Sequence, residues 1–525
     1  MFVNKEVLDA LSDVSHNYVE DAAPRKRSGL WRAVTAAAAA LVLLVGALLV
    51  LPKFIGRPWD GNMAANDSAD TASEPPVSEA AETDIPAVLP TEPPAPTPTP
   101  KPFPAVNLRE AAAAYPEERE YPQYPSLEAF TEDNAEEWSA AMDLWQQAAI
   151  VREKLAKEAP DISGFARALF TAIMDGSEGS NLVCSPANIY VALSMLAECT
   201  NGETREQILS ALGVSDTGSL RSGVSALLDT ESNDDGAMRC LFENSLWLNN
   251  GFGYNTETME RLAEVYRAAG FWGDPADPEF AGLLGKWLDE KTGGTLGDIA
   301  SHISLDPNMM LTLASTLRFS GKWFEEYPVS ETKPGVFHSP SGDVEREFMH
   351  KNSRFMLYYR GRDFTAAAEI CDSDGDYIWY LMPDEGVTIE EIMAGEGMEF
   401  LLSDKSETCR QVYDVYITIP KLHITSDLDI ADAMKKLGVT DCFESSRSDY
   451  SGLAQGSGLA LTEARHCVSI TSDEKGIDAS SLVLLGAGAA IPEKVYVNFD
   501  RPFAFAIMGK SNAPLFMGIV NDPIG

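Results

Sequence analysis

Two kinds of hydrophobic pattern divide this chain. From Ala33 to Leu51 the residues form an uncharged apolar run broken only by Thr35, whereas beyond Asp161 the apolar residues recur at helical or strand spacing. This spacing predicts helices over Phe165–Met174 and Ile189–Leu196 and strands over Met309–Leu317 and Tyr413–Pro420. We therefore expect an α+β domain over 161–525, which is larger than most single cores.

The stretch from Gly476 to Ala490 fits neither an exposed strand nor an ordinary surface loop, because it is rich in Gly and Ala and also strongly apolar. At a period of two residues, one face contains only small or apolar side chains: Ile477, Ala479, Ser481, Val483, Leu485 and Ala487. A segment that is a loop in one state and a buried strand in another would have this pattern.

The apolar run of residues 33–51 is long enough to cross about 30 Å of hydrocarbon as a helix. Cationic residues are more numerous just before the run than just after it, which predicts that the N-terminus stays inside. We expect a single transmembrane helix over residues 31–53, in contact with the lipid bilayer through Ala33–Leu51, and a C-terminal domain outside the cell. A cleaved signal peptide followed by secretion is the alternative, although Ala64-Ala65 is a poor cleavage site.

The chain between the apolar run and the domain cannot form a core. Residues 54–125 are acidic and then rich in proline, a composition that favours an extended, disordered stalk. Residues 126–160 follow as a leading segment, in which Asn134–Ala156 has the spacing of one amphipathic helix. That helix would either pack on the domain or lead into its first helix. Residues 1–30 are a polar segment expected in the cytoplasm.

The charge and the cysteines exclude several classes of function. A formal net charge of -40 argues against nucleic acid as a partner, because phosphate binding needs a basic face. The seven cysteines are scattered without a Cys-x-x-Cys motif, so they indicate neither a disulfide framework nor a zinc site. We expect no metal site and no cofactor.

Independent enzyme activity is also not expected. The chain contains neither a Gly-x-Ser-x-Gly motif nor a His-Glu-x-x-His motif, and its six histidines are not ordered as in a catalytic triad. Residues 372–376 have the composition of a calcium loop, but the glycine is misplaced for one. They are better explained as a hairpin turn between Ala366–Cys371 and Tyr377–Met382.

Six short motifs in a fixed order carry a resemblance to a known family. They are Asn181–Asn188, Asn244–Trp247, Leu317–Trp323, Pro420–Leu422 with Ala431–Gly438, Asp500–Phe503 and Pro514–Val520. Together they resemble the serpins, the serine protease inhibitors, over Asp161–Gly525. The resemblance implies a serpin fold with three β-sheets, eight or nine helices and an exposed reactive-centre loop.

The resemblance also implies roles for single residues. His466 and Ser185 resemble the polar shutter beneath the main sheet, with Asn188 and Ser315 standing where the family has serine and asparagine. Trp323 resembles the tryptophan at the breach, where the loop enters the sheet. Glu474 resembles the hinge glutamate that pairs with a lysine on a neighbouring strand, and Gly476 resembles the hinge glycine.

The position of the cleaved bond follows from the usual distance to the hinge glycine, which gives Ala490-Ile491, with Ala489-Ala490 as the alternative. Alanine before the bond suits the shallow pocket of an elastase-like or subtilisin-like serine protease. The sequence therefore predicts a monomeric, irreversible inhibitor that traps such a protease by loop insertion, on a bacterial cell surface. The alternative is a non-inhibitory serpin-fold module for binding or adhesion.

Overall fold

The structure is a computed structural model, and it describes residues 107–125, 130–177, 179–303, 305–307, 309–354, 356–371, 377–403, 413–454, 459–461, 464–477 and 493–524. Its core is a six-stranded sheet in the order β1-β17-β16-β10-β9-β8. Two neighbouring inner strands, β16 (Phe503–Met508) and β17 (Pro514–Val520), are buried along their whole length, because their apolar runs are covered on both faces. The other strands are β1 (Leu182–Cys184), β8 (Leu357–Arg360), β9 (Phe364–Ile370) and β10 (Tyr377–Pro383).

A second sheet, called the main sheet below, is built on two long antiparallel strands. β3 (Met238–Asn249) pairs with β5 (Leu311–Lys322), from Met238 opposite Gly321 to Leu248 opposite Leu311. β3 also pairs in parallel with β4 (Ala268–Gly273) and forms a short pairing with β2 (Asn233–Asp234). On its other side, β5 pairs with β14, which is only Gly476–Ile477.

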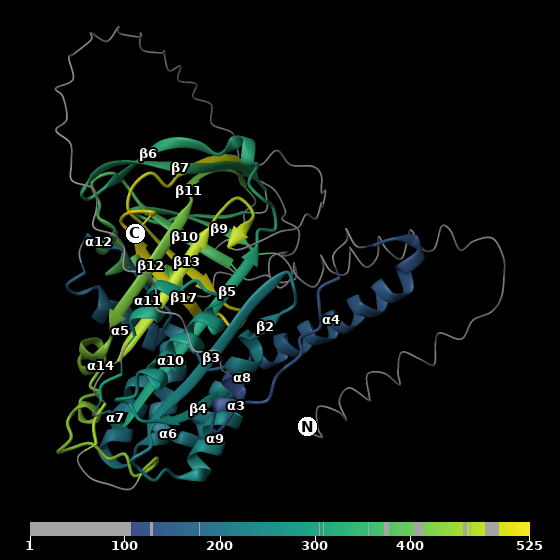
Figure 1. Cartoon of the computed structure of the whole chain (residues 1–525). Helices are drawn as coiled ribbons and strands as arrows, with labels where there is room; N and C mark the ends of the chain where they lie inside the picture. Colours follow the sequence, from purple (N-terminus) through teal and green to yellow (C-terminus); the bar gives the residue numbers. More distant parts are fainter. Residues whose placement is uncertain are drawn as a thin grey trace, which may run out of the picture. The chain divides into compact units, whose positions relative to one another are not determined.

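Two further sets of strands complete the sheets. β12 (Leu422–Asp429) and β13 (Arg465–Ser472) form an antiparallel pair of their own. A four-stranded sheet has the order β15-β11-β7-β6 and lies at the top of Figure 1. Its strands are β6 (Lys333–Ser339), β7 (Gly342–Ser353), β11 (Tyr413–Pro420) and β15 (Glu493–Asn498).

Helix α6 (Pro186–Cys199) is the central helix, and it is buried on nearly all sides. It begins where the Ser185 hydroxyl accepts a hydrogen bond from the Asn188 amide at 3.2 Å, with proline in the first turn. It contacts β5 and β17 as well as helices on every side. The remaining α-helices are α3 (Leu108–Ala111), α4 (Ala135–Leu155), α5 (Ser163–Met174), α7 (Gly202–Leu212), α8 (Thr217–Glu231), α9 (Thr256–Tyr266), α10 (Pro278–Thr292), α11 (Gly297–His302), α12 (Ile389–Met393), α13 (Glu396–Leu402) and α14 (Ala431–Lys436).

The sequence patterns located these elements well. The helices predicted over Phe165–Met174 and Ile189–Leu196 and the strand predicted over Tyr413–Pro420 are all present, and β9 and β10 form the expected hairpin. The predicted counts need correction. The described part of the domain contains helices α5 to α14, more than eight or nine, because short helices such as α12 are included. β12 and β13 form a set of strands separate from the main sheet, because β13 pairs with β12 whereas β5 pairs with β3 and β14.

The leading segment packs on the domain, the first of the two possibilities. Its helix α4 runs outward from its contact with α8 (Figure 1). The end of the predicted stalk also packs on the domain, where Ala113 and Ala114 donate to the Gly270 carbonyl on β4. The Trp145 indole donates to the buried Asp235 carboxylate at 2.9 Å. Arg152 donates to Asn233 at 2.7 Å. α4 is therefore tied to β2 and to the turn that follows it.

Trp145→Phe should lower the stability of the domain by about 1–2 kcal/mol, because it removes one donor from a buried carboxylate while it keeps an aromatic ring. The measurement is the urea unfolding midpoint of the full chain. Trp272→Phe is the matched control, since Trp272 is half-exposed on β4. Equal midpoints for Trp145→Phe and the wild type would show that this contact adds nothing to stability.

Candidate functional site

The hinge is the turn that joins β13 to β14. Asp473 and Gly476 close it with two backbone hydrogen bonds of 3.0 and 3.3 Å. Gly476 then pairs with Lys322 and Ile477 pairs with Gly321, so the chain leaves the turn as a strand antiparallel to β5. Gly476 has φ +153°, and a Cβ atom there would lie 2.3 Å from the Gly321 carbonyl oxygen. The close approach of two backbones requires glycine at this position.

Glu474 anchors the hinge to the four-stranded sheet. Its carboxylate lies 2.9 Å from Lys421 Nζ and accepts a hydrogen bond from the Thr332 hydroxyl at 2.8 Å. Burial raises the pKa of Glu474, but the hydrogen bonds from Lys421 and Thr332 outweigh it and hold this pKa below its ordinary value. The sequence did not identify the lysine. Lys421 stood in the Pro420–Leu422 motif, which we used only as evidence of the fold.

Trp323 lies under the hinge, at the end of the main sheet called the breach. Its ring is fully buried, and its indole N–H donates to the Asp473 carbonyl at 2.9 Å. Its backbone amide donates to the Lys475 carbonyl at 3.1 Å. The tryptophan therefore holds both ends of the hinge turn through its backbone and its side chain.

A buried ion pair supports this tryptophan, and the sequence analysis missed it. Lys351 Nζ lies 2.8 Å from a Glu369 carboxylate oxygen and 5.7 Å from the centre of the Trp323 ring. The Tyr327 hydroxyl donates to the same carboxylate, and Lys351 lies 4.2 Å from the Tyr327 ring centre. The available signal was a lysine at an inward position of a strand, which indicates a buried partner.

His466 lies beneath the main sheet on β13. Its Nε2 accepts a hydrogen bond from the Ser185 backbone amide at 2.9 Å, so the ring proton sits on Nδ1. Burial lowers the pKa of His466 to about 4, because the site favours the uncharged ring. The neutral imidazole thus connects β13 to the start of α6.

The polar cluster continues from α6 to β5 and β3. The Ser315 hydroxyl lies 2.5 Å from Asn188 Oδ1 and 2.6 Å from Asn244 Oδ1. The Asn244 amide in turn donates to the Tyr266 carbonyl at 2.9 Å. Asn244 was quoted only as part of a motif, and its inward position next to Ser315 depends on the pairing of β3 with β5. We call Ser185, Asn188, Asn244, Ser315 and His466 the shutter cluster.

A hollow of about 260 Å³ lies between β5 and β13. Thr316 and Phe319 line it from β5, Cys467 and Ser469 from β13, and Leu296 from the turn before α11. The Thr316 hydroxyl is buried and has no hydrogen-bond partner among the described residues. β14 is paired with β5, which also lines this hollow.

The inserting side chains and the bond lie outside the described residues. These are Ala479, Ser481, Val483, Leu485, Ala487, Ala489, Ala490 and Ile491, and for Ile477 only the backbone is described. Their roles stay predictions.

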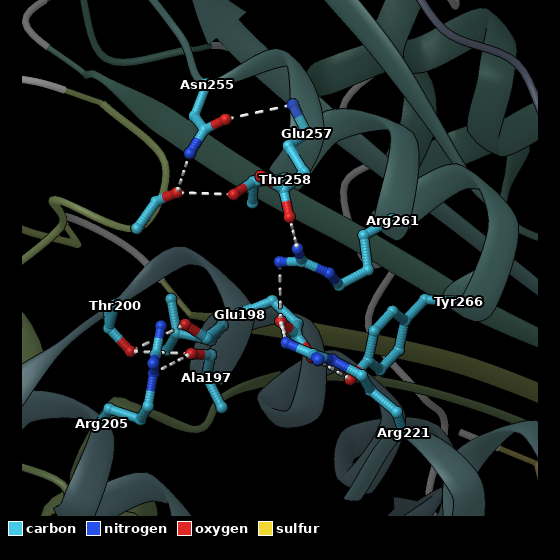
Figure 2. Close-up of polar contacts among 12 residues, drawn as sticks. Ala197, Glu198, Thr200, Arg205, Arg221, Asn255, Glu257, Thr258, Arg261 and Tyr266 are labelled. Atoms are coloured by element: carbon cyan, nitrogen blue, oxygen red, sulfur yellow. Dashed lines mark hydrogen bonds and ion pairs between the residues drawn. The ribbon is translucent and has the colours of Figure 1, made fainter. Parts of the chain in front are cut away.

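A second buried polar cluster, drawn in Figure 2, surrounds Glu198 at the end of α6. Its carboxylate accepts two hydrogen bonds from Arg221, at 2.7 and 2.8 Å, and one from the Tyr266 hydroxyl at 2.9 Å. Arg261 lies 3.4 Å away and also pairs with Glu257. A carboxylate with this many donors is neither a nucleophile nor a base. It ties α6 to α8 and α9.

The hinge turn, the buried Trp323 beneath it and the hollow between β5 and β13 lie together at one end of the main sheet. Comparison with known sequences identifies the family. The profile of the family described as Serpin (serine protease inhibitor) matches residues 161–523. The chain therefore belongs to the serpin family, a family of protease inhibitors and not of enzymes.

Similar proteins support this assignment. Alpha-1-antiproteinase of Callosciurus caniceps is 29% identical over 383 residues, which cover 70% of this chain and 89% of the relative. Hibernation-specific plasma protein HP-55 of Tamias sibiricus is 26% identical over 374 residues, covering 70% and 88%. The native structure of a thermophilic serpin, Tengpin, has a TM-score of 0.62 at 23% identity, covering 69% of this chain and 93% of that one.

These comparisons correct the expected location. A bacterial membrane protein with its domain outside the cell was the prediction, but HP-55 is a plasma protein by name and both relatives are mammalian. Among the described residues, no helix is long and apolar enough to cross a membrane. The predicted anchor, Ala33–Leu51, lies outside them. The comparison with these relatives therefore contradicts the predicted membrane location.

His466 should make the domain lose stability as the pH falls from 6.5 to about 4. The unfolded chain takes up a proton at the ordinary histidine pKa, whereas the folded chain does not until about pH 4. The loss is on the order of 3 kcal/mol across this window and absent above pH 6.5. We expect His466→Gln to show a smaller loss in urea unfolding, with His423→Gln at an exposed position of β12 as the control. A gap between wild type and His466→Gln that does not change with pH would exclude this titration.

Lys421→Met should lower the free energy of unfolding by about 1 kcal/mol. The effect is small because Lys421 is partly exposed and solvent weakens its ion pair with Glu474. The contribution is present above the ordinary glutamate pKa and is lost as the pH falls through the lowered pKa of Glu474. Urea midpoints at pH 7 and pH 3.5 measure it. Lys435→Met breaks an exposed pair with Asp432 and should have little effect. A Lys421→Met effect that is equal at both pH values would assign it to another contact.

Proposed function

We propose that this chain is an irreversible suicide-substrate inhibitor of serine proteases. The observation that carries the proposal is the pairing of Gly476–Ile477 with β5, the strand that lines the hollow shared with β13. A strand added after Ile477 would run along β5 and meet β13 on its other side. The family membership supports the same function, since relatives carry names such as alpha-1-antiproteinase.

The reaction uses the catalytic serine of the target protease. This serine attacks the carbonyl carbon of Ala490, the bond to Ile491 breaks, and the amine of Ile491 leaves as the new N-terminus. The protease remains esterified to Ala490. Before water can hydrolyse the ester, the freed segment after Gly476 inserts between β5 and β13 and carries the protease with it.

The energy of insertion comes from backbone pairing and from apolar burial. Each new ladder hydrogen bond contributes about 0.5–1.5 kcal/mol net, and the small face with Ala479, Val483 and Leu485 is removed from water at about 25 cal/mol per Å². The buried Thr316 hydroxyl would gain partners from the new strand. The fixed turn between Asp473 and Gly476 keeps the start of the strand in register.

The alanine before the proposed bond limits which class of protease can cleave it. A shallow pocket accepts it, so we propose an elastase-like or subtilisin-like protease, with Ala489-Ala490 as the alternative bond. A trypsin-like protease needs Arg or Lys at this position, and the nearest downstream basic residue is Lys494.

The test mixes the full chain with an elastase or a subtilisin near equimolar ratio and follows the products by SDS gel and intact mass. We expect an SDS-stable adduct and a C-terminal fragment that starts at Ile491. This fragment contains β16 and β17 of the core, so it should separate only under denaturing conditions. The loop-cleaved chain should also melt at a much higher temperature than the intact chain.

Two matched variants sharpen the result. Ala479→Arg places a charge on the inserting face and should convert the inhibitor into a cleaved substrate, because a buried unpaired charge costs several kcal/mol. Ser480→Arg places the same charge on the opposite face and should still trap the protease. Clean cleavage of the wild type with fully active protease would instead favour the binding module.

A further inference from the structure

The outer face of the four-stranded sheet carries an aromatic feature that the loop mechanism does not use. In the pairing of β11 with β15, Tyr416 lies opposite Tyr496, and in the pairing of β11 with β7 it lies opposite Asn352. The two tyrosine rings stack with centres 4.8 Å apart and planes at 22°. Lys494 Nζ lies 5.3 Å from the Tyr416 ring centre. We call Tyr416, Tyr496, Lys494 and Asn352 the tyrosine face.

This face is open and hollowed. Tyr496 is 74% exposed, the largest exposed fraction among the exposed large hydrophobic side chains of the described residues. Beside the rings lies a hollow of about 430 Å³, with a wall of Thr418, Asn498 and His350. Rings fixed by stacking lose little side-chain freedom when a partner covers them, which is why tyrosine is enriched at protein interfaces.

The distance along the chain places this face beside the proposed target. Tyr496 follows Ile491 by five residues, which span at most about 18 Å when fully extended. A protein partner of standard size covers about 800 Å² on each side, a patch roughly 30 Å across. A protease centred on the bond before Ile491 therefore reaches the tyrosine face.

We propose that the tyrosine face is a docking surface for the target protease, outside its active-site cleft. The partner is the target protease, because the face lies within five residues of chain from the proposed bond and its two stacked tyrosine rings are open to a partner. Tyr496 is the anchor and Tyr416 holds it in place. The inference rests on the proposed inhibitory function and adds a determinant of target choice.

The experiment measures the second-order rate constant of adduct formation between the full chain and the elastase or subtilisin that forms the adduct. Tyr496→Ala should slow adduct formation about tenfold or more, with the ratio of chain to protease needed for full inhibition unchanged. Tyr496→Phe keeps the stacked ring and should lose less than threefold. Trp272→Ala is the matched control, since Trp272 is an exposed ring stacked on Tyr254 of another part of the fold.

The outcomes are separable. A wild-type rate for Tyr496→Ala, or an equal loss for Trp272→Ala, would overturn the docking surface while adduct formation itself stands. Complete absence of an adduct with wild type would overturn the proposed function and this inference together. Sedimentation of the wild type and of each variant measures whether the chain forms a dimer through this face. A dimer that Tyr496→Ala dissociates would assign the face to a second copy of the chain and overturn the inference.

Discussion

The structure depends on one constraint, the separation of β5 from β13. Each strand is paired on its outer side, β5 with β3 and β13 with β12, and the hollow between them is lined by hydroxyl, thiol and aromatic side chains. Backbone groups and the Thr316 hydroxyl at this gap would gain partners from a further strand. Under the proposed function, the free energy of adding a strand at this gap would drive loop insertion.

Contacts at both ends hold the gap in its present form. At the breach, Glu474 is bound by Lys421 and Thr332, and Trp323 holds the turn below it. Beneath the sheet, His466 connects β13 to the start of α6. These contacts are polar. A hydrogen bond or ion pair contributes more to stability where water is excluded than where the groups are exposed. These contacts hold the hinge turn against β5 and connect β13 to α6, on either side of the hollow.

The sequence predicted the helices and strands better than it predicted which side chains pair with one another. Regular spacing located α5, α6 and β11, because the residues that share one face of a helix or strand lie a few positions apart in the sequence. Lys421, Lys351 and Asn244 act through residues far away in the chain, and only the pairing of strands brings them to Glu474, Glu369 and Ser315. The motifs gave His466 and Trp323 positions, but the direction of their hydrogen bonds depends on backbone atoms of Ser185 and Asp473. The docking of α4 on α8 could not be predicted, because it joins segments far apart in the chain and the spacing of apolar residues does not identify the surface they meet.

The two paired residues of β14 would lower the entropic cost of the first step of the proposed insertion. A strand that enters a sheet from solution pays the entropy of bringing two distant segments together before any ladder bond forms. Here Gly476 and Ile477 already lie in register with Lys322 and Gly321, so the proposed insertion would lengthen an existing ladder one residue at a time. Each step then needs only a side chain small enough to pass and a backbone free to follow. If the chain inhibits as proposed, its loop must insert faster than water hydrolyses the ester, and the preformed first pair would favour insertion in that competition.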